Sequence, residues 1–226
     1  QKFLKNYINP YTPYNGLLVF HGTGSGKTCA AITIAEQFIP FLQQNEIEEQ
    51  RKVLLVYPGS TVEANYKANL YNFNKELKEK KRKLSPGSLQ CTNDKYYVEE
   101  REYTKEDRKK MIEKKYSQYY QIIGNRELTN IIRDKIKEIT EIQENPVIRE
   151  RMIKKSIQEE FSNRLIIIDE IHSIKKTGKE GEDKDLKIMD ALEKILENSK
   201  NIKLILMSAT PMFDNPKEII DLLNLL

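Results

Sequence analysis

Short apolar runs alternate along the chain with longer amphipathic stretches. Four of these runs are apolar without alternation and are bounded by turn residues, as strands buried on both faces of a sheet should be. They are Leu17–Phe20, Val53–Tyr57, Leu165–Ile168 and Lys203–Met207. A weaker fifth candidate lies at Tyr120–Ile123. The alternation predicts an α/β fold in which a mostly parallel sheet is flanked by helices on both faces.

Local signals mark the start of three helices. One is expected to begin at Lys27 and to run toward Pro40. Ser60 and Glu63 have the spacing of a capping box, which opens a second helix. The last helix is announced by an N-cap residue, a proline at the first helical position and a reciprocal acid. These three residues are Asn215, Pro216 and Glu218.

The stretch from about Lys75 to Asn163 differs from the rest and predicts a charged, mainly helical insertion. Its basic run Lys78–Lys83 has the charge to contact phosphates, but a solvated helix end is the favoured explanation. Several tyrosines interleave with basic residues, which suits either stacking on nucleic-acid bases or attachment of the insertion to the core. They are Tyr96, Tyr97, Tyr103, Tyr116, Tyr119 and Tyr120.

A glycine-rich loop follows the first predicted strand and opens the first helix. Glycines let a backbone curl around a triphosphate so that its N–H groups face the phosphates. Lys27 is expected to reach the β- and γ-phosphates, and the Thr28 hydroxyl to bind Mg²⁺. The strict pattern has a glycine where this chain has His21. The residues predicted to bind ATP are Gly22, Thr23, Gly24, Ser25, Gly26, Lys27 and Thr28.

Two acids, Asp169 and Glu170, stand at the carboxyl end of a predicted buried strand. Ligands of open α/β sheets bind at this edge, and burying two carboxylates without a cation is costly. Asp169 is therefore predicted to hold Mg²⁺, and Glu170 to orient and deprotonate the attacking water. Alone, the pair would equally suit the cap of a turn. Ser208, Ala209 and Thr210 end the last predicted strand and are a weak signal by themselves.

Together these segments resemble motifs I, II and III of superfamily 2 helicases: Gly24–Thr28, Asp169–His172 and Ser208–Thr210. The resemblance implies a RecA-like P-loop domain. It assigns His172 a place in the catalytic set and implies that His172 and Ser208–Thr210 couple hydrolysis to nucleic-acid binding. The segment Val53–Pro58 with its following turn resembles motif Ia. That similarity assigns nucleic-acid backbone contacts to Pro58, Ser60 and Thr61.

Two further similarities narrow the family. The continuation 208–215, running on into 219–223, is similar to the chromatin-remodeller-like branch, which implies tracking of duplex DNA. The approach 14–21 to the glycine-rich loop resembles helicases of large cytoplasmic DNA viruses. These include the poxvirus early transcription factor small subunit, the poxvirus transcription termination ATPase and African swine fever virus relatives. The resemblance implies ATP and Mg²⁺ as cofactors. It also implies a role in transcription and, as a partner, RNA polymerase or another transcription factor subunit.

The whole chain, residues 1–226, is expected to be the first of two RecA-like domains. It begins at Gln1 and stops inside an apolar helical pattern, so we expect a fragment of a longer protein. In the family the second domain supplies arginine residues that stabilise the transition state, so the fragment is expected to bind ATP but hydrolyse it slowly. A recruitment module that uses ATP as a switch is the alternative function. An unrelated P-loop ATPase is disfavoured by His172 and Ser208–Thr210.

Composition adds little to this picture. The net charge of +4 and a pI near 8.8 allow a polyanionic partner without establishing one. No apolar run approaches the roughly 20 residues that span a bilayer, so no membrane partner is expected. Cys29 and Cys91 lack the spacing of a metal site or a disulfide framework. Cys29 is expected to be a small buried hydrophobic residue, and the compartment to be reducing. The viral resemblance implies a cytoplasmic location, in a viral factory or virion.

Overall fold

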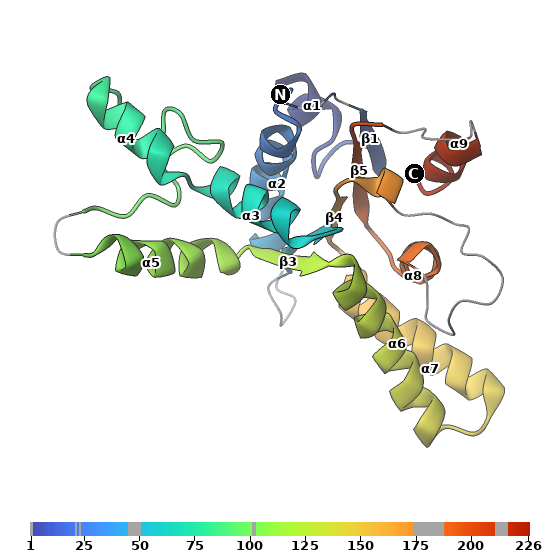
Figure 1. Ribbon diagram of the computed structural model, residues 1–226. Helices are drawn as coiled ribbons and strands as arrows, with labels where there is room; N and C mark the ends of the chain where they lie inside the picture. Colours follow the sequence, from blue (N-terminus) through green and yellow to red (C-terminus); the bar gives the residue numbers. More distant parts are fainter. Residues whose placement is uncertain are drawn as a thin grey trace.

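Five parallel strands form one sheet in the computed structural model of the protein, which confirms the expected α/β class (Figure 1). The described residues are 2–20, 22, 24–44, 51–100, 103–173, 188–210 and 217–226. The strands are β1 (Gly16–Phe20), β2 (Val53–Tyr57), β3 (Tyr120–Gly124), β4 (Leu165–Ile168) and β5 (Lys203–Ser208). They lie in the order β1-β5-β4-β2-β3, and every neighbouring pair is parallel. All carboxyl ends therefore meet at one edge of the sheet.

Helices join the strands and cover both faces of the sheet. The α-helices are α1 (Lys2–Tyr7), α2 (Lys27–Gln44), α3 (Ser60–Leu70), α4 (Phe73–Lys81), α5 (Lys105–Ser117), α6 (Asn125–Ile142), α7 (Pro146–Phe161), α8 (Ile188–Asn198) and α9 (Lys217–Leu223). A 3-10 turn, η1, spans Ile171–Ser173.

Alternate residues of each strand enter two separate cores. Leu55 and Ile167 pack on one face against residues of α1, α2, α3 and α5. Leu54 and Ile166 pack on the other face against residues of α6, α7, α8 and α9. A central strand with both faces covered has no solvent side, which explains why its sequence is apolar without alternation.

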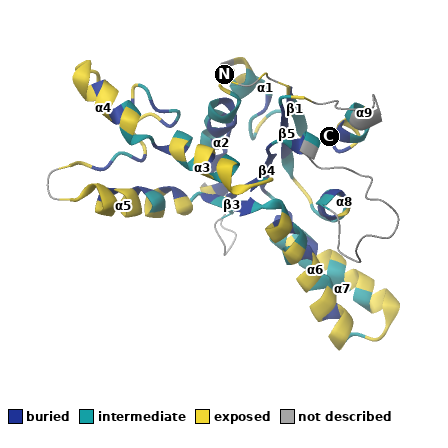
Figure 2. Ribbon diagram, in the orientation of Figure 1, coloured by how far each residue is buried: buried dark blue, intermediate teal, exposed yellow. Residues whose placement is uncertain are grey.

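The charged stretch from about 75 to 163 supplies parts of both layers. Helices α4 and α5 lie on the side of α3, while β3 pairs with β2 as the edge strand of the sheet. Helices α6 and α7 form a hairpin that extends from the sheet, and its outer end is largely exposed (Figure 2).

Three of the interleaved tyrosines attach this stretch to the core. Tyr96, Tyr116 and Tyr120 are at most 5% exposed. The hydroxyls of Tyr96 and Tyr120 donate to Glu36 Oε1 of helix α2 at 2.9 and 2.7 Å. Lys95 adds an ion pair to the other Glu36 oxygen at 2.6 Å. For these three tyrosines, the structure selects attachment to the core and excludes stacking on nucleic-acid bases.

Two predictions of helix ends are wrong. Helix α2 continues four residues beyond Pro40, to Gln44. Ser60 is the first residue of α3 and not its cap: the N-cap is Gly59, and no side chain caps the helix. Glu63 instead accepts a hydrogen bond from the Tyr57 hydroxyl at 2.7 Å and pairs with Lys67. The cap expected at Asn215 and Pro216 lies outside the described residues.

The prediction that the cysteines stay unpaired is also wrong. Cys29, in the first turn of α2, forms a disulfide with Cys91, and their Cα atoms lie 5.4 Å apart. The segment after α4 folds back along α2, which brings together two cysteines separated by 62 positions in sequence. No local spacing signals such a contact, because it depends on how the whole stretch packs.

Reduction of this disulfide is expected to lower the free energy of unfolding by about 2–4 kcal/mol. A cross-link that closes a long loop removes conformational entropy from the unfolded chain. Urea unfolding with and without a thiol reductant measures the difference. Cys91→Ser serves as the control, since its unfolding midpoint should not respond to the reductant. An unchanged midpoint for the wild-type protein would refute the stabilising role.

Candidate functional site

The glycine-rich loop leads from the carboxyl end of β1 into α2. Gly24 and Gly26 have φ angles of +78° and +85°, which side chains other than glycine rarely adopt. A Cβ atom at either position would meet no atom within 4 Å, so backbone conformation and not crowding requires glycine there. The Ser25 hydroxyl donates to the Gly22 carbonyl at 2.6 Å and closes the loop. His21 and Thr23 lie outside the described residues.

Lys27 lies between the two acids predicted as catalytic. Its Nζ is 2.6 Å from Glu170 Oε1 and 3.3 Å from Asp169 Oδ1. Asp169 is 2% exposed, and burial raises the pKa of its carboxyl above the ordinary value while the Lys27 ammonium opposes that rise. The fold thus joins the first and second motifs, 143 residues apart, into one charged cluster.

Glu170 has an unusual backbone conformation in this cluster. Its φ of +51° lies in the left-handed region, and its N–H donates to Asp169 Oδ1 at 2.8 Å. Glu170 Oε2 is buried without a hydrogen-bond partner among the described residues, although His172 Nδ1 lies 3.2 Å away. A buried carboxylate oxygen without a donor is costly unless a water or ligand fills its place.

His172 connects the acids to the end of β5. Its Nδ1 lies 3.0 Å from Ser208 Oγ, and the same hydroxyl accepts a hydrogen bond from the Thr210 N–H at 3.0 Å. Ser208 is fully buried, Ala209 is partly buried and Thr210 is exposed. The three residues therefore form a path from the acidic cluster to the surface.

Helix α3 contributes two residues that the sequence analysis missed. Asn65 Nδ2 donates to the Thr28 hydroxyl at 3.4 Å. Tyr66 is fully buried, and burial, followed by the charge and hydrogen bond of Asp169, raises the pKa of its phenol well above the ordinary value. Neither residue belongs to a recognisable pattern. Their only signal is their position one turn after the motif Ia residues Ser60 and Thr61.

Comparison with known families agrees with this geometry. A family model described as "Type III restriction enzyme, res subunit" matches residues 1–213. The chain belongs to this family. It is a helicase-type ATPase domain of superfamily 2, as the three motifs indicated.

Similar proteins of this helicase family come from large cytoplasmic DNA viruses. Two proteins of Acanthamoeba polyphaga mimivirus that carry the name of an ATP-dependent RNA helicase are 33% and 31% identical over the whole chain. The chain covers 18% and 32% of their lengths. An African swine fever virus protein named as an early transcription factor large subunit homolog is 26% identical over the whole chain, which covers 24% of it. The expected similarity to African swine fever virus proteins is thus confirmed.

The helicase domain exposes its motif Ia residues at the same edge of the sheet. Pro58, Ser60 and Thr61 are all exposed, between the carboxyl end of β2 and the first turn of α3. Because α3 also carries Asn65 and Tyr66, one helix links this surface to Thr28 and Asp169. No helix in the described part of the chain is both long and apolar enough to cross a bilayer.

Proposed function

We propose that this helicase domain binds Mg²⁺-ATP and acts as the nucleotide-binding half of a nucleic-acid motor. The observation that carries the proposal is the position of Lys27 Nζ, within 3.3 Å of both acids and directly after the glycine-rich loop. In this arrangement a cationic side chain and a backbone cradle face two carboxylates, which is the chemistry that phosphoryl transfer requires.

The residues present fit a magnesium ion and a triphosphate. Lys27 leaves the two carboxylates with one uncompensated negative charge, and Glu170 Oε2 lacks a donor. Within the described ranges, no group of three or more acidic, cysteine or histidine side chains could hold a metal. That agrees with Mg²⁺, which keeps several waters and takes few protein ligands beside substrate phosphates. Asp169 and the Thr28 hydroxyl would hold the ion, and Gly22–Thr28 the phosphates.

Each residue has a separate part in the proposed reaction. Bound Mg²⁺ would neutralise negative charge on the phosphate oxygens. Lys27 transfers its contacts from the carboxylates to the phosphates, which frees Glu170. The Glu170 carboxylate then orients the attacking water and accepts its proton at Oε2. His172 lies between Glu170 and Ser208, so a change in the position of the acid would alter its contact with Ser208 and thereby the segment Ser208–Thr210.

A second RecA-like domain is proposed to complete the site. The chain covers only 18–32% of the length of its mimivirus and African swine fever virus relatives. Arginine residues that stabilise the transition state contribute about 10³–10⁵ in rate in related systems. The chain alone should therefore bind ATP and turn it over slowly, and movement along a polymer needs both domains.

Duplex DNA is the proposed track. The support comes from the remodeller-like continuation 208–215, whose residues after Thr210 lie outside the described part. RNA is the competing track, because the mimivirus relatives carry the name of RNA helicases. A motor that moves along either polymer must contact backbone and shape, so little base specificity is expected.

ATP turnover should rise several-fold with duplex DNA and less with single strands. Matched duplex DNA, single-stranded DNA and RNA, titrated at fixed low salt into the protein with its second domain, measure the preference. Stimulation by RNA alone would move the protein to RNA tracking.

A transcription recruitment module remains the second candidate. It is favoured by the African swine fever virus relatives that carry the name of an early transcription factor subunit. In this function ATP acts as a switch, and the partner is RNA polymerase or another transcription factor subunit. Turnover that no nucleic acid stimulates, together with ATP-dependent binding of polymerase, would favour it. For either function we propose a location in the cytoplasm of an infected cell, in a viral factory, or in the virion.

A further inference from the structure

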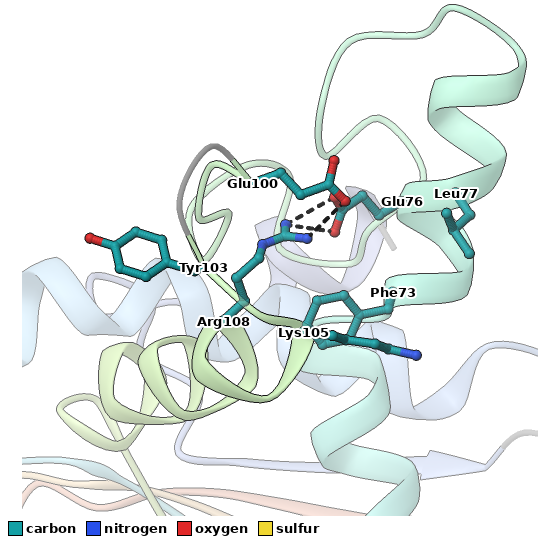
Figure 3. A pocket seen from close by; sticks show the side chains of 7 residues that line it. All are labelled: Phe73, Glu76, Leu77, Glu100, Tyr103, Lys105 and Arg108. Carbon is teal, nitrogen blue, oxygen red and sulfur yellow. Dashed lines mark hydrogen bonds and ion pairs between the residues drawn. The ribbon is translucent and has the colours of Figure 1, made fainter.

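The acidic side chains of helix α4 are buried, whereas most of its basic side chains are exposed. Glu76 and Glu79 are only 3% and 2% exposed. Glu76 pairs with the buried Arg108 guanidinium at 2.9 Å, an interaction seen from close by in Figure 3. Glu79 accepts hydrogen bonds from the backbone N–H groups of Gly87 and Leu89 at 3.0 and 2.6 Å. Both acids of the helix are therefore consumed in holding the fold together.

The basic residues of the same segment face solvent. Lys78, Lys81, Arg82 and Lys83 are exposed, and none has an ion pair with any described residue. Figure 2 shows that α4 is largely exposed. Lys80 differs from them, because it pairs with Glu76 and Glu100. The segment 76–83 contains both acids and bases in its sequence, but the folded protein exposes four cations without an ion pair to any described residue within the six positions 78–83. We call this quartet the α4 basic end.

We propose that the α4 basic end binds the phosphodiester backbone of nucleic acid, as a contact separate from the motif Ia surface. Four like charges on one helix end repel each other, and phosphates relieve that repulsion while releasing condensed counterions. Exposed acids among these bases would pair with them and repel phosphates. Here the exposed side of the helix carries no acid between Asn74 and Leu84.

The position of α4 suits this contact. Helix α3 starts at the motif Ia residues and leads directly to α4, separated from it by two residues. From the start of α3 to Lys83, the two helices and the two extended residues between them span at most about 40 Å, since a helical residue adds about 1.5 Å and an extended one about 3.3 Å. That distance corresponds to about 12 base pairs of duplex. The α4 basic end therefore lies at most a little more than one turn of duplex from the motif Ia contact, on the same polymer. This choice of polymer over an acidic protein rests on the proposed function.

Charge removal with a matched control tests the proposal. The test variant combines Lys78→Gln, Lys81→Gln, Arg82→Gln and Lys83→Gln. The control removes the same charge from exposed positions of the α6–α7 hairpin. Its substitutions are Lys137→Gln, Arg151→Gln, Lys154→Gln and Lys155→Gln. Fluorescence anisotropy of the full chain with a 30-base-pair duplex, without nucleotide and over a range of salt, gives affinity and salt slope. Thermal melts check that both variants fold.

The test variant should bind duplex at least about tenfold more weakly at 0.1 M salt. Its slope of log affinity against log salt should be shallower by about 3 to 4, since each phosphate contact contributes about 0.9. The control should keep most of the wild-type slope. Equal losses in both variants, or no loss in the test variant, would overturn the proposal. Binding of polyglutamate that depends on these four cations, in a protein whose duplex affinity does not depend on them, would overturn it in favour of an acidic protein partner.

A separate readout distinguishes this proposal from the proposed function. ATP affinity, measured by calorimetry, should be the same in wild type and test variant, because α4 does not contribute to the nucleotide site. If wild-type protein fails to bind ATP while the variants differ as expected on DNA, the α4 basic end stands and the motor proposal falls.

Discussion

Glu170→Gln is expected to slow ATP hydrolysis by about 10²–10⁴-fold, the usual contribution of a positioned general base. The substitution removes the proton acceptor but keeps a side chain of the same shape. ATP affinity should stay within a few-fold of wild type, because Asp169 and Thr28 are untouched and Lys27 loses a competing ion pair at 2.6 Å. Steady-state turnover in the protein with its second domain measures the first quantity, and calorimetry measures the second.

The control for this variant is Glu197→Gln, an identical change at an exposed position of α8. It should leave turnover unchanged. Near-normal turnover in Glu170→Gln would require another proton acceptor. Asp169 is the nearest candidate, and Asp169→Asn should already reduce both magnesium dependence and rate through loss of the metal ligand.

Lys27→Ala is expected to weaken binding of Mg²⁺-ATP and of ADP by at least about 100-fold. The change removes charge-assisted hydrogen bonds to phosphate, each of which contributes about 1.5–3 kcal/mol. Calorimetry with wild type and variant measures the ratio. Equal affinities would defeat the assignment of the glycine-rich loop.

A folding control is needed for this variant, since Lys27 also balances Asp169, which is 2% exposed. Loss of that partner leaves a buried charge uncompensated, at a cost of about 3–5 kcal/mol. Lys27→Met/Asp169→Asn removes both charges and should melt closer to wild type than Lys27→Ala, yet still bind ATP weakly. Recovery of ATP affinity in this double variant would show that the defect was one of folding.

The strands were predictable because their environment leaves a local signal. All five predicted strands match the structure within one residue at each end, since strands covered on both faces must be apolar throughout. The loop after β1 was equally visible, because its positive φ angles at Gly24 and Gly26 restrict the residue type. Whether Pro58, Ser60 and Thr61 contact nucleic acid stays a prediction.

Features that depend on packing between distant segments left no such signal. The Arg108–Glu76 pair joins positions 32 apart, and nothing near either residue marks it as buried. Tyr66 reads as one more polar residue of a helix until its contact with Asp169 is seen. The expected capping box is absent for a related reason. Tyr57 and Lys67 each contact one oxygen of the Glu63 carboxylate, which therefore does not reach back to the start of the helix.

Helix α2 is attached at two points to the short segment 91–96. The disulfide holds it at Cys29, and Glu36 holds Lys95 and Tyr96 seven residues later, about 10 Å along the helix. Two anchor points prevent rotation about either one, so the helix and the segment 91–96 move as one rigid body. The Thr92 hydroxyl of that segment donates to the Leu70 carbonyl at 2.8 Å, so a displacement of α2 during ATP turnover would be passed on to the residues just before α4.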